Sequence, residues 1–326
     1  MFVISFFIIL NFSLILFNKN IANILKLYDH PNKDRKLHKE KTPITGGFII
    51  IINLIFYYFL REKLNFDINL FANLNNFYIF SLTCLFLYLL GVYDDKFEIT
   101  ANKKFFILIL ILIPTIFLDQ EISLQNIRLS FFKTEYSIGS FSYIWTLICF
   151  LLLLNAINMF DGINIQVGFY ALVISIIFIA SDYNKFFFII LLISLISFLF
   201  LNVKSNSFLG DGGSYLLSFI IGYFFIKIYN STIITNADQI VLIMLIPGLD
   251  LMRLFIFRIL SKRHPFSPDR NHLHHLLLKK FSYYQVISII QFMIFLPVII
   301  NLLFGYTLGI LILSLIFYIL VVYKLS

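Results

Sequence analysis

The sequence predicts an all-α fold, a polytopic bundle of about eleven transmembrane helices. The chain of 326 residues is 60% hydrophobic and only 13% charged, with 41 phenylalanines and a mean hydropathy of +0.92. This composition excludes an ordinary water-soluble core. A hydrocarbon layer of about 30 Å requires about 20 mostly apolar residues per helix, and runs of nearly this length recur between polar segments. We therefore expect a single integral-membrane domain over residues 1–326.

The expected helices follow these apolar runs in order. The first run has no basic residues ahead of it and no small-residue cleavage site behind it, so we interpret it as a retained span and not as a signal peptide. The runs are residues 2–17, 44–60, 77–92, 105–118, 141–157, 166–181, 186–201, 214–228, 239–260, 284–303 and 307–323.

The cationic residues indicate how the chain is oriented. The 25 basic and 17 acidic residues give a net charge of +8, and most of the cations fall in alternate loops when the N-terminus is placed outside. The positive-inside rule makes those loops cytoplasmic, together with the C-terminus. It also explains the charge without a nucleic-acid partner. Cys84 and Cys149 lie in apolar runs without metal-type spacing and indicate no redox compartment.

Between the expected helices, one outer segment carries its own local pattern. Residues 119–140 alternate weakly between apolar and polar side chains, which predicts a small hairpin. We attach no function to this hairpin.

Conspicuous acids lie beside the spans, all on the predicted cytoplasmic face. Asp94 and Asp95 occur in GVYDDKFE, Asp161 in NAINMFDGIN and Asp211 in FLGDGGS. A charge within the bilayer costs about 2.5 to 3.5 kcal/mol on insertion scales, so acids at span ends are often functional. Each acid alone has an ordinary explanation. Asp161 and Asp211 could cap the start of a helix, and the pair at 94 and 95 could form a solvated turn.

The segment SKRHPFSPDRNHLHH, residues 261–275, concentrates charge in an otherwise apolar chain. It holds four of the six histidines, and Pro265 and Pro268 prevent a continuous helix. Cationic and imidazole donors in one loop suit phosphate or diphosphate groups. The alternative is a solvated loop that merely follows the positive-inside rule.

Four carboxylates with neighbouring glycines and cations favour a Mg²⁺-diphosphate site. Mg²⁺ prefers oxygen ligands and takes only one or two protein carboxylates plus substrate phosphates, and Asp211 is the best single candidate. Zinc bound by HLHH is the alternative metal. The repulsion between Asp94 and Asp95 and a phosphate would have to be offset by Mg²⁺, Lys96 or the cationic loops.

The motifs GVYDDK, NAINMFDGIN, FLGDGGS, PGLD and HPFSPDRNHLHH, in this order, resemble the polyprenyl-phosphate N-acetylhexosamine-1-phosphate transferases, over residues 29–275. The resemblance implies a Mg²⁺-dependent enzyme of the bacterial cytoplasmic membrane with its active site on the cytoplasmic face. It would transfer N-acetylhexosamine-1-phosphate from a UDP-sugar to polyprenyl (undecaprenyl) phosphate, release UMP and start a cell-envelope polysaccharide such as lipopolysaccharide O-antigen. PDRNHLHH resembles the GlcNAc-1-phosphate branch, whereas the MurNAc-pentapeptide enzymes have three consecutive histidines. Oligomeric state is left open, with a homodimer as one option.

The resemblance also implies roles for individual residues. Asp211 would hold Mg²⁺, Asp94 and Asp95 would serve the acceptor phosphate, and Phe208 would stack on uracil. The remaining substrate-side residues are Lys41 in the first basic loop, then Asn158, Asp161, Gly162 and Asn164 beside the nucleotide, and Arg270, His272, His274 and His275 around the diphosphate or sugar. The chain departs from the family motif NxxNxxDGxDG at its end, where Asn164 and Ile165 replace the last Asp and Gly.

Two other classes of protein compete with this interpretation. A transporter could use the acids as an ion pathway, but they lie at span ends on one face and no inverted repeat is seen. Asp250 is the exception within a span, and Arg253 at position i+3 is expected to neutralise it. A structural scaffold would not require glycines beside each acid.

Overall fold

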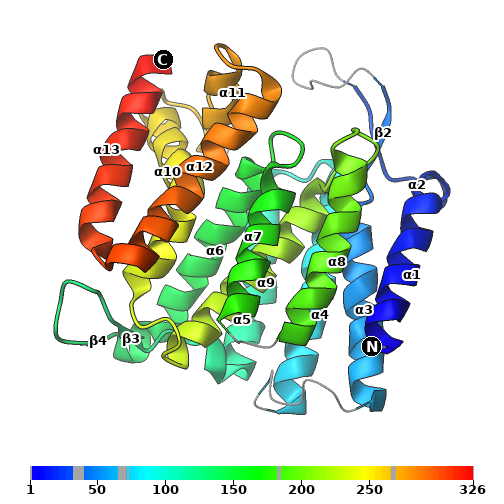
Figure 1. Cartoon of the computed structure of the whole chain (residues 1–326), viewed down its shortest axis with the longest axis horizontal. Coiled ribbons are helices and arrows are strands. Elements are labelled where there is room, and N and C mark those ends of the chain that lie inside the picture. Colours follow the sequence, from blue (N-terminus) through cyan, green and yellow to red (C-terminus); the bar gives the residue numbers. More distant parts are fainter. Residues whose placement is uncertain are drawn as a thin grey trace. The chain divides into compact units, whose positions relative to one another are not determined.

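The computed structural model describes residues 2–31, 40–64, 71, 73–181, 185–265 and 269–325, and within them the chain is almost entirely helical (Figure 1). The predicted all-α class is confirmed, because every expected apolar run coincides with a helix. The main helices are α1 (Phe2–Leu16), α3 (Gly46–Leu64), α4 (Leu74–Phe97), α5 (Ala101–Leu118), α6 (Ser142–Phe160), α7 (Gln166–Ala180), α8 (Lys185–Asn202), α9 (Gly210–Asn230), α10 (Ala237–Leu260), α12 (Tyr283–Phe304) and α13 (Thr307–Leu325).

Eight of the described helices are long and apolar enough to cross a membrane, and a ninth span arises if α1 and α2 (Asn18–Leu25), bent by 70°, count as one. The chain is thus a multi-pass membrane protein. Helix α3 carries Arg61, Glu62 and Lys63 in its last turn, and three charges are too many for it to count among these spans. Helix α7, with 15 residues, is too short. The number of eleven spans remains a prediction.

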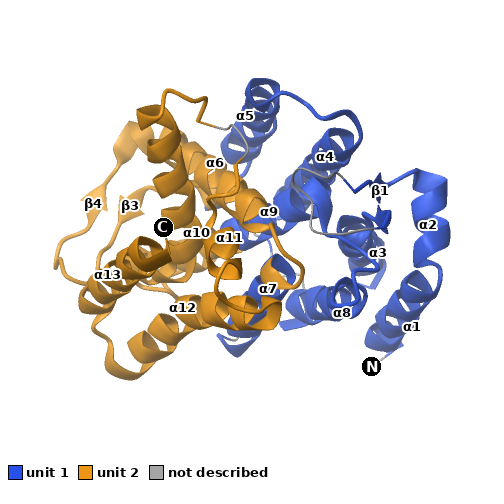
Figure 2. Ribbon diagram, turned by 90° about the horizontal axis from the view of Figure 1, so that it is seen from above, with its two compact units in different colours: residues 1–121, 167–223 blue, residues 122–166, 224–326 orange. Residues whose placement is uncertain are grey.

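Two compact units divide the described chain (Figure 2). Unit 1 comprises residues 1–121 and 167–223, and unit 2 comprises residues 122–166 and 224–326. Whether the chain behaves as the expected single domain stays a prediction.

Unit 1 is built on close helix packing and on aromatic side chains. Helix α8 packs against α1 and α3, and α4 packs against α3 and α5. Tyr223 lies 4.7 Å from Phe80 between ring centroids, inside a larger set of buried rings. Such contacts contribute beyond their buried area, by about 0.5 to 1.5 kcal/mol per pair.

Glycines set the closest approach in unit 1. A Cβ added to Gly91 of α4 would lie 2.2 Å from the backbone nitrogen of Gly212, and one added to Gly47 of α3 would lie 2.6 Å from that of Gly213. Backbone therefore touches backbone where α3 and α4 meet the first turn of α9. This packing fixes the position of the FLGDGGS motif along helices α3 and α4.

Unit 2 is organised around α10, which packs against α6, α12 and α13. The predicted hairpin in residues 119–140 is confirmed: β3 (Asn126–Ile127) pairs antiparallel with β4 (Tyr136–Ser137). Buried Asp238 in the first turn of α10 accepts hydrogen bonds from the backbone and hydroxyl of Ser130 and so anchors the hairpin. Three further short elements are η2 (Gln120–Ile122), η3 (Gly139–Phe141) and α11 (Leu273–Leu278).

A two-stranded pair closes the first basic loop of unit 1. Strands β1 (Tyr28–Asp29) and β2 (Thr42–Pro43) pair antiparallel just before α3. Residues 32–39, which hold several cations of this loop, and Pro268 of the residue 261–275 segment lie outside the described residues.

Candidate active site

Backbone hydrogen bonds within unit 1 hold the segment that leads to Asp211. The Phe208 nitrogen donates to the Pro43 carbonyl at 2.8 Å, and the Gly46 nitrogen donates to the Phe208 carbonyl at 2.9 Å. Gly210 follows with a φ of +73°, which L side chains rarely adopt, and turns the chain into α9. Asp211 consequently lies in the first turn of α9, beside strand β2 and the start of α3.

Three of the predicted acids converge there with one lysine. We define the carboxylate cluster as Asp94, Asp95 and Asp211 together with Lys104. Nζ of Lys104 forms ion pairs with Oδ2 of Asp94 and, at 3.0 Å, with Oδ2 of Asp211. The Asp94 side chain is only 7% exposed and that of Asp211 30% exposed, so the cluster opens on the Asp211 side.

The two adjacent acids at the end of α4 have different partners. Asp94 also accepts a hydrogen bond from the Ile99 nitrogen at 2.8 Å and so ties down the turn that leads to α5. Asp95 points the other way and accepts from the Asp211 nitrogen, at 3.2 and 3.1 Å to its two carboxylate oxygens. A carboxylate at a helix N-terminus satisfies otherwise unpaired N–H groups and complements the helix dipole. Asp95 thus joins the last turn of α4 to the first turn of α9.

The donor set of this cluster fits Mg²⁺. Its oxygens are hard carboxylate ligands of the kind that Mg²⁺ selects over nitrogen or sulfur. Counted as ionised, three carboxylates and one ammonium leave a formal charge of −2, which a divalent cation would balance. Among the residues that the structure describes, no three histidine, cysteine, aspartate or glutamate side chains form a ready-made metal site. The cluster would therefore hold Mg²⁺ only with oxygen ligands from water or substrate, through Asp211 and at most one neighbour.

Lys104 is the residue that the sequence analysis missed. The expected counter-charge was Lys96, but Lys96 is exposed and the ion pairs are made by Lys104 in the first turns of α5. The signal was its position: α5 starts directly after the acidic end of α4, and a lysine near its start faces back toward that end.

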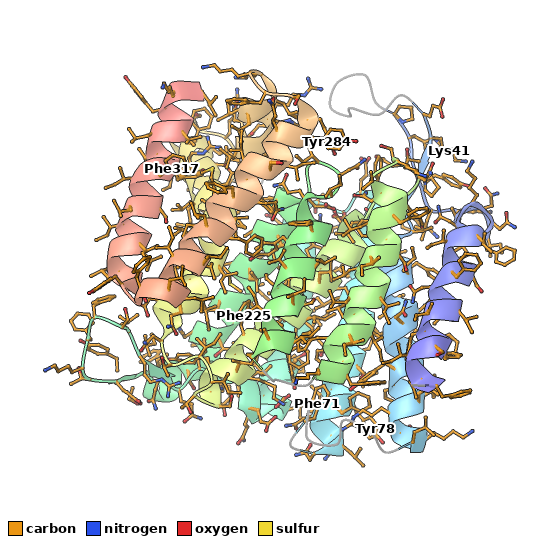
Figure 3. All side chains as sticks on the ribbon, viewed as in Figure 1. Lys41, Phe71, Tyr78, Phe225, Tyr284 and Phe317 are labelled. Atoms are coloured by element: carbon orange, nitrogen blue, oxygen red, sulfur yellow. The ribbon has the colours of Figure 1, made fainter. Side chains whose placement is uncertain are left out.

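Two other predicted residues lie in unit 1. Phe208 is half-buried three residues before Asp211, and its backbone is paired with β2 as described above. Lys41 lies exposed just before β2 (Figure 3). Its Nζ lies 3.7 Å from the ring centroid of Tyr28. A cation–π contact of this kind contributes about 0.5 to 1 kcal/mol at an exposed position, which is weak enough for Lys41 to exchange it for a phosphate.

In unit 2, the NAINMFDGIN motif forms the end of α6 and the loop that follows. Asp161 is the C-terminal cap of α6, with its nitrogen donating to the Ile157 carbonyl at 3.1 Å. The expectation that Asp161 stands at the start of a span is wrong, since α7 begins only at Gln166. The apolar pattern of α6 runs on through Phe160, and this postpones the turn. Asn158 lies in the last turn of the same helix.

The loop after α6 meets the HLHH segment at one point. A Cβ added to Gly162 would lie 2.1 Å from Nε2 of His274, so only glycine admits the histidine ring there. Tyr283 donates through its hydroxyl to the Asn164 carbonyl at 3.1 Å. Ile165, which replaces the family's glycine, has a φ of +74°, an unfavourable conformation for a β-branched residue. The motif's departure is therefore visible as backbone strain.

The histidine cluster comprises His272, His274 and His275 at the start of α11. His272 Nδ1 lies 3.0 Å from Oδ2 of Asp250, while the rings of His274 and His275 are 4.3 Å apart between centroids. Arg270, just before it, is exposed. The predicted pairing of Asp250 with Arg253 is confirmed, with Nη2 of the arginine 2.7 Å from Oδ1 of the aspartate.

Burial determines the protonation of this segment. It lowers the pKa of His274, which is 2% exposed, to about 3, and the neighbouring His275 and His272 lower it further in the same direction. The pKa of His275 is also lowered, first by burial. His274 is therefore neutral near pH 7, and its Nε2 has no hydrogen-bond partner among the described residues. It could offer a ligand a neutral imidazole but not a cation.

A buried ion pair holds the other side of this segment. Arg258 Nε donates to Oδ2 of Asp269 at 2.7 Å, and its Nη1 donates to the Pro265 carbonyl at 2.8 Å. Although partial burial opposes it, the hydrogen bonds from Arg258 and from the Asn271 backbone lower the pKa of Asp269. In the described part of the chain, no three histidine, cysteine, aspartate or glutamate side chains are grouped as a metal site, so the geometry does not support zinc at HLHH.

Comparisons with known proteins agree with the motifs. The model of the family described as Glycosyl transferase family 4 matches residues 77–229. The chain is 25% identical over 277 residues to the undecaprenyl-phosphate alpha-N-acetylglucosaminyl 1-phosphate transferase of Yersinia pestis, covering 80% of this chain and 72% of that protein. It is 25% identical over 268 residues to the probable undecaprenyl-phosphate N-acetylglucosaminyl 1-phosphate transferase of Bacillus subtilis (strain 168), covering 80% and 72%. For the undecaprenyl-phosphate alpha-N-acetylglucosaminyl 1-phosphate transferase of Escherichia coli (strain K12), identity is 24% over 275 residues, covering 81% and 72%. The resemblance to the polyprenyl-phosphate N-acetylhexosamine-1-phosphate transferases that the five motifs predict is thereby confirmed.

Proposed function

We propose that this chain transfers an N-acetylhexosamine-1-phosphate, GlcNAc-1-phosphate in the first place, from a UDP-sugar to undecaprenyl phosphate and releases UMP. The reaction would start a cell-envelope polysaccharide at the cytoplasmic face of a bacterial inner membrane. The observation that carries the proposal is the carboxylate cluster, in which Asp94 and Asp211 share one lysine and Asp95 accepts from the backbone nitrogen of Asp211. The names of the relatives support the acceptor and the sugar.

The chemistry is a phosphoryl transfer. An oxygen of the acceptor phosphate forms a bond to the phosphorus that carries the sugar, and the bond from that phosphorus to the UMP oxygen breaks. Catalysis of such a step depends mainly on positioning and on stabilising charge. Mg²⁺, held through Asp211, would supply charge neutralisation for the diphosphate. Lys104 would contribute a second positive charge at the same place.

General-base chemistry has little to add at neutral pH. An alkyl phosphate has a second pKa of about 6, so most of the acceptor is already a dianion near pH 7. We therefore assign Asp94 and Asp95 a positioning role. This assignment agrees with their contacts, since Asp94 holds Lys104 and Asp95 holds the first turn of α9.

The remaining predicted residues would serve the nucleotide and the sugar. Phe208 would stack on uracil, Asn158, Asp161, Gly162 and Asn164 would line the nucleotide, and Lys41, Arg270 and the histidine cluster would contact phosphate or sugar oxygens. Asn164 offers both a donor and an acceptor, which can pair with a uracil edge.

The decisive experiment uses membranes that contain the chain, radiolabelled UDP-GlcNAc and added undecaprenyl phosphate. Formation of labelled lipid together with UMP, abolished by a chelator and restored by Mg²⁺, supports the proposal. A panel of UDP-sugars in the same assay identifies the donor. Solute flux without labelled lipid would favour the rival transporter. The saturation of Asp250 by Arg253, Tyr318 and His272 leaves that intramembrane acid poorly suited to an ion pathway.

Reporter fusions test the proposed topology. A periplasmic reporter should be active at the N-terminus and a cytoplasmic one at the C-terminus. A cytoplasmic signal at both ends would contradict the orientation predicted from the positive-inside rule.

A further inference from the structure

Asp250 is a buried acid of unit 2 whose two carboxylate oxygens both have polar partners. It is 5% exposed, and its Oδ1 accepts from Arg253 Nη2 at 2.7 Å, from the Leu273 nitrogen at 3.1 Å and from the Tyr318 hydroxyl at 3.1 Å. Its Oδ2 faces Nδ1 of His272 at 3.0 Å. The two oxygens therefore have different roles, since Oδ1 fixes helices α10, α11 and α13 together and Oδ2 contacts the histidine.

The contact determines which nitrogen of His272 remains available. A carboxylate only accepts, so Nδ1 must carry a proton and donate. Among the described residues Nε2 of His272 has no hydrogen-bond partner. The neutral ring is thus held as the Nδ1–H tautomer, with Nε2 left for a ligand.

The surrounding groups make this arrangement rigid. Arg253 also donates to the Asn271 carbonyl at 2.5 Å and, through Nε, to the Tyr318 hydroxyl at 3.0 Å. Asn271, just before His272, is therefore bound to Arg253, and Leu273, just after it, is bound to Asp250, which is itself paired with Arg253. Neither Asp250 nor Tyr318 lies in the segment whose histidines they orient.

We propose that Asp250 is a positioning residue of the transferase, which holds His272 as the Nδ1–H tautomer so that Nε2 accepts a hydrogen bond from a hydroxyl or N–H group of the sugar substrate. This inference rests on the proposed function for the identity of that substrate. The pairing itself is a property of unit 2 and can be measured without turnover. Groups behind a metal-ligating histidine fix its tautomer and orientation, and their loss costs about 10- to 100-fold in metal affinity or activity; we expect a loss of similar size here.

Asp250→Asn gives a sharp test because of the unequal roles of the two oxygens. With three donors around Oδ1, the amide oxygen of the asparagine should take that place, so its NH₂ group would face Nδ1. Two donors cannot face each other, and the ring should switch to the Nε2–H tautomer. The measurement is ¹⁵N NMR of histidine-labelled full-length protein in detergent at about pH 9, above the ordinary histidine pKa of about 6.5. The His272 signal is assigned from its loss in His272→Gln.

The matched control is Asp238→Asn, the same substitution at another buried acid of α10, whose partner is Ser130. We expect Asp250→Asn to switch the His272 tautomer and to lower kcat about 10- to 100-fold with a smaller change in KM. Asp238→Asn should leave the tautomer unchanged. An Nδ1–H signal that persists in Asp250→Asn, or a kcat loss no larger than in Asp238→Asn, would overturn the proposal.

The two proposals fail in different ways. If the wild-type chain forms no labelled lipid, the proposed function fails. The tautomer measurement still decides whether Asp250 sets the state of His272, and an unchanged tautomer would reject the positioning role whatever the reaction.

Discussion

The carboxylate cluster of unit 1 and the Asp250 network of unit 2 use the same residue types in opposite ratios. In the first, three acids gather around one lysine, whose ammonium pairs with Asp94 and Asp211, and the Asp211 side remains partly open. In the second, one buried acid is surrounded by a guanidinium, a phenol, a backbone N–H and an imidazole. A site with too few cations is prepared for a cationic ligand, whereas a saturated acid organises the residues around it. From the balance of charge within each group, we expect the cluster to bind a cation and Asp250 to hold its neighbours in place.

The largest effect is expected from Asp211→Asn, which removes a negative charge from the carboxylate cluster of unit 1. Turnover should fall below about one thousandth, because an amide gives no negative charge to a Mg²⁺ shared with a diphosphate. Labelled-lipid formation at limiting and saturating Mg²⁺ measures it, with Asp238→Asn as the control for a buried acid-to-amide change. Near-normal activity of a correctly inserted variant at limiting Mg²⁺ would exclude Asp211 as the ligand.

The second prediction replaces Lys104, the lysine of the carboxylate cluster, and so removes positive instead of negative charge. Lys104→Met keeps the aliphatic chain and should lower kcat about 100-fold, since a charge close to the transferred phosphoryl group is lost. The cluster becomes more negative, so the Mg²⁺ concentration for half-maximal rate should fall at the same time. The neighbouring exposed Lys103, changed to methionine, provides the matched control. A half-maximal concentration that rises would show that Lys104 does not compete for the same carboxylates.

Arg270 tests whether the residue 261–275 segment binds phosphate or only follows the positive-inside rule. Arg270→Ala should lower kcat/KM about 10- to 100-fold, because bidentate contact with a phosphoryl group is strongest in the transition state. Lys279→Ala, at an equally exposed position after α11, should have little effect in the same assay. Small and equal losses would return the segment to the interpretation as a solvated basic loop.

Acidification should weaken unit 2 through His274. Its folded-state pKa of about 3 lies below the ordinary value of 6.5, so the unfolded chain binds a proton that the folded chain excludes between those two values. The free energy of unfolding should therefore fall as pH drops through this window and level off below it. Thermal unfolding in detergent across that range measures the effect, and His274→Gln should reduce the slope. The same change at exposed His264 should not, and an unaltered slope in His274→Gln would contradict the assignment.

The smallest effect is expected at Ile165. Left-handed backbone costs an L-residue about 1 to 2 kcal/mol, so in Ile165→Gly the relief of strain should roughly offset the lost apolar contact. Ile163→Gly, two residues earlier and 5% exposed, should cost about 2 to 5 kcal/mol, as for other large-to-small core changes. Denaturant or thermal unfolding of both variants gives the comparison. Equal losses would mean that the strain at Ile165 is not stored in the folded state.

The sequence predicted whatever depends on composition and on short-range spacing. Apolar runs placed every main helix, and the i+3 spacing predicted the pair of Asp250 and Arg253. The role of Lys104 was not predicted, because in the sequence a lysine that follows the positive-inside rule cannot be distinguished from one that pairs with acids on another helix. The role of Tyr318 was not predicted, because its partners Asp250 and Arg253 lie 68 and 65 residues away in the sequence. Asp161 was placed at the wrong helix end, since the apolar run of α6 gives no signal for where it stops.

The glycine contacts around FLGDGGS also bear on mutational tolerance. Any substitution at Gly47 or Gly91 brings a Cβ into space that backbone atoms of Gly212 and Gly213 already fill. A scan of all substitutions would thus mark these two glycines as intolerant because of packing alone. Intolerance here would consequently say little about chemistry, and a glycine-rich motif next to an acid would look catalytic even in a protein that had lost its activity. Only exchanges that keep the shape, such as Asp211→Asn, can distinguish a residue that reacts from one that simply has no room.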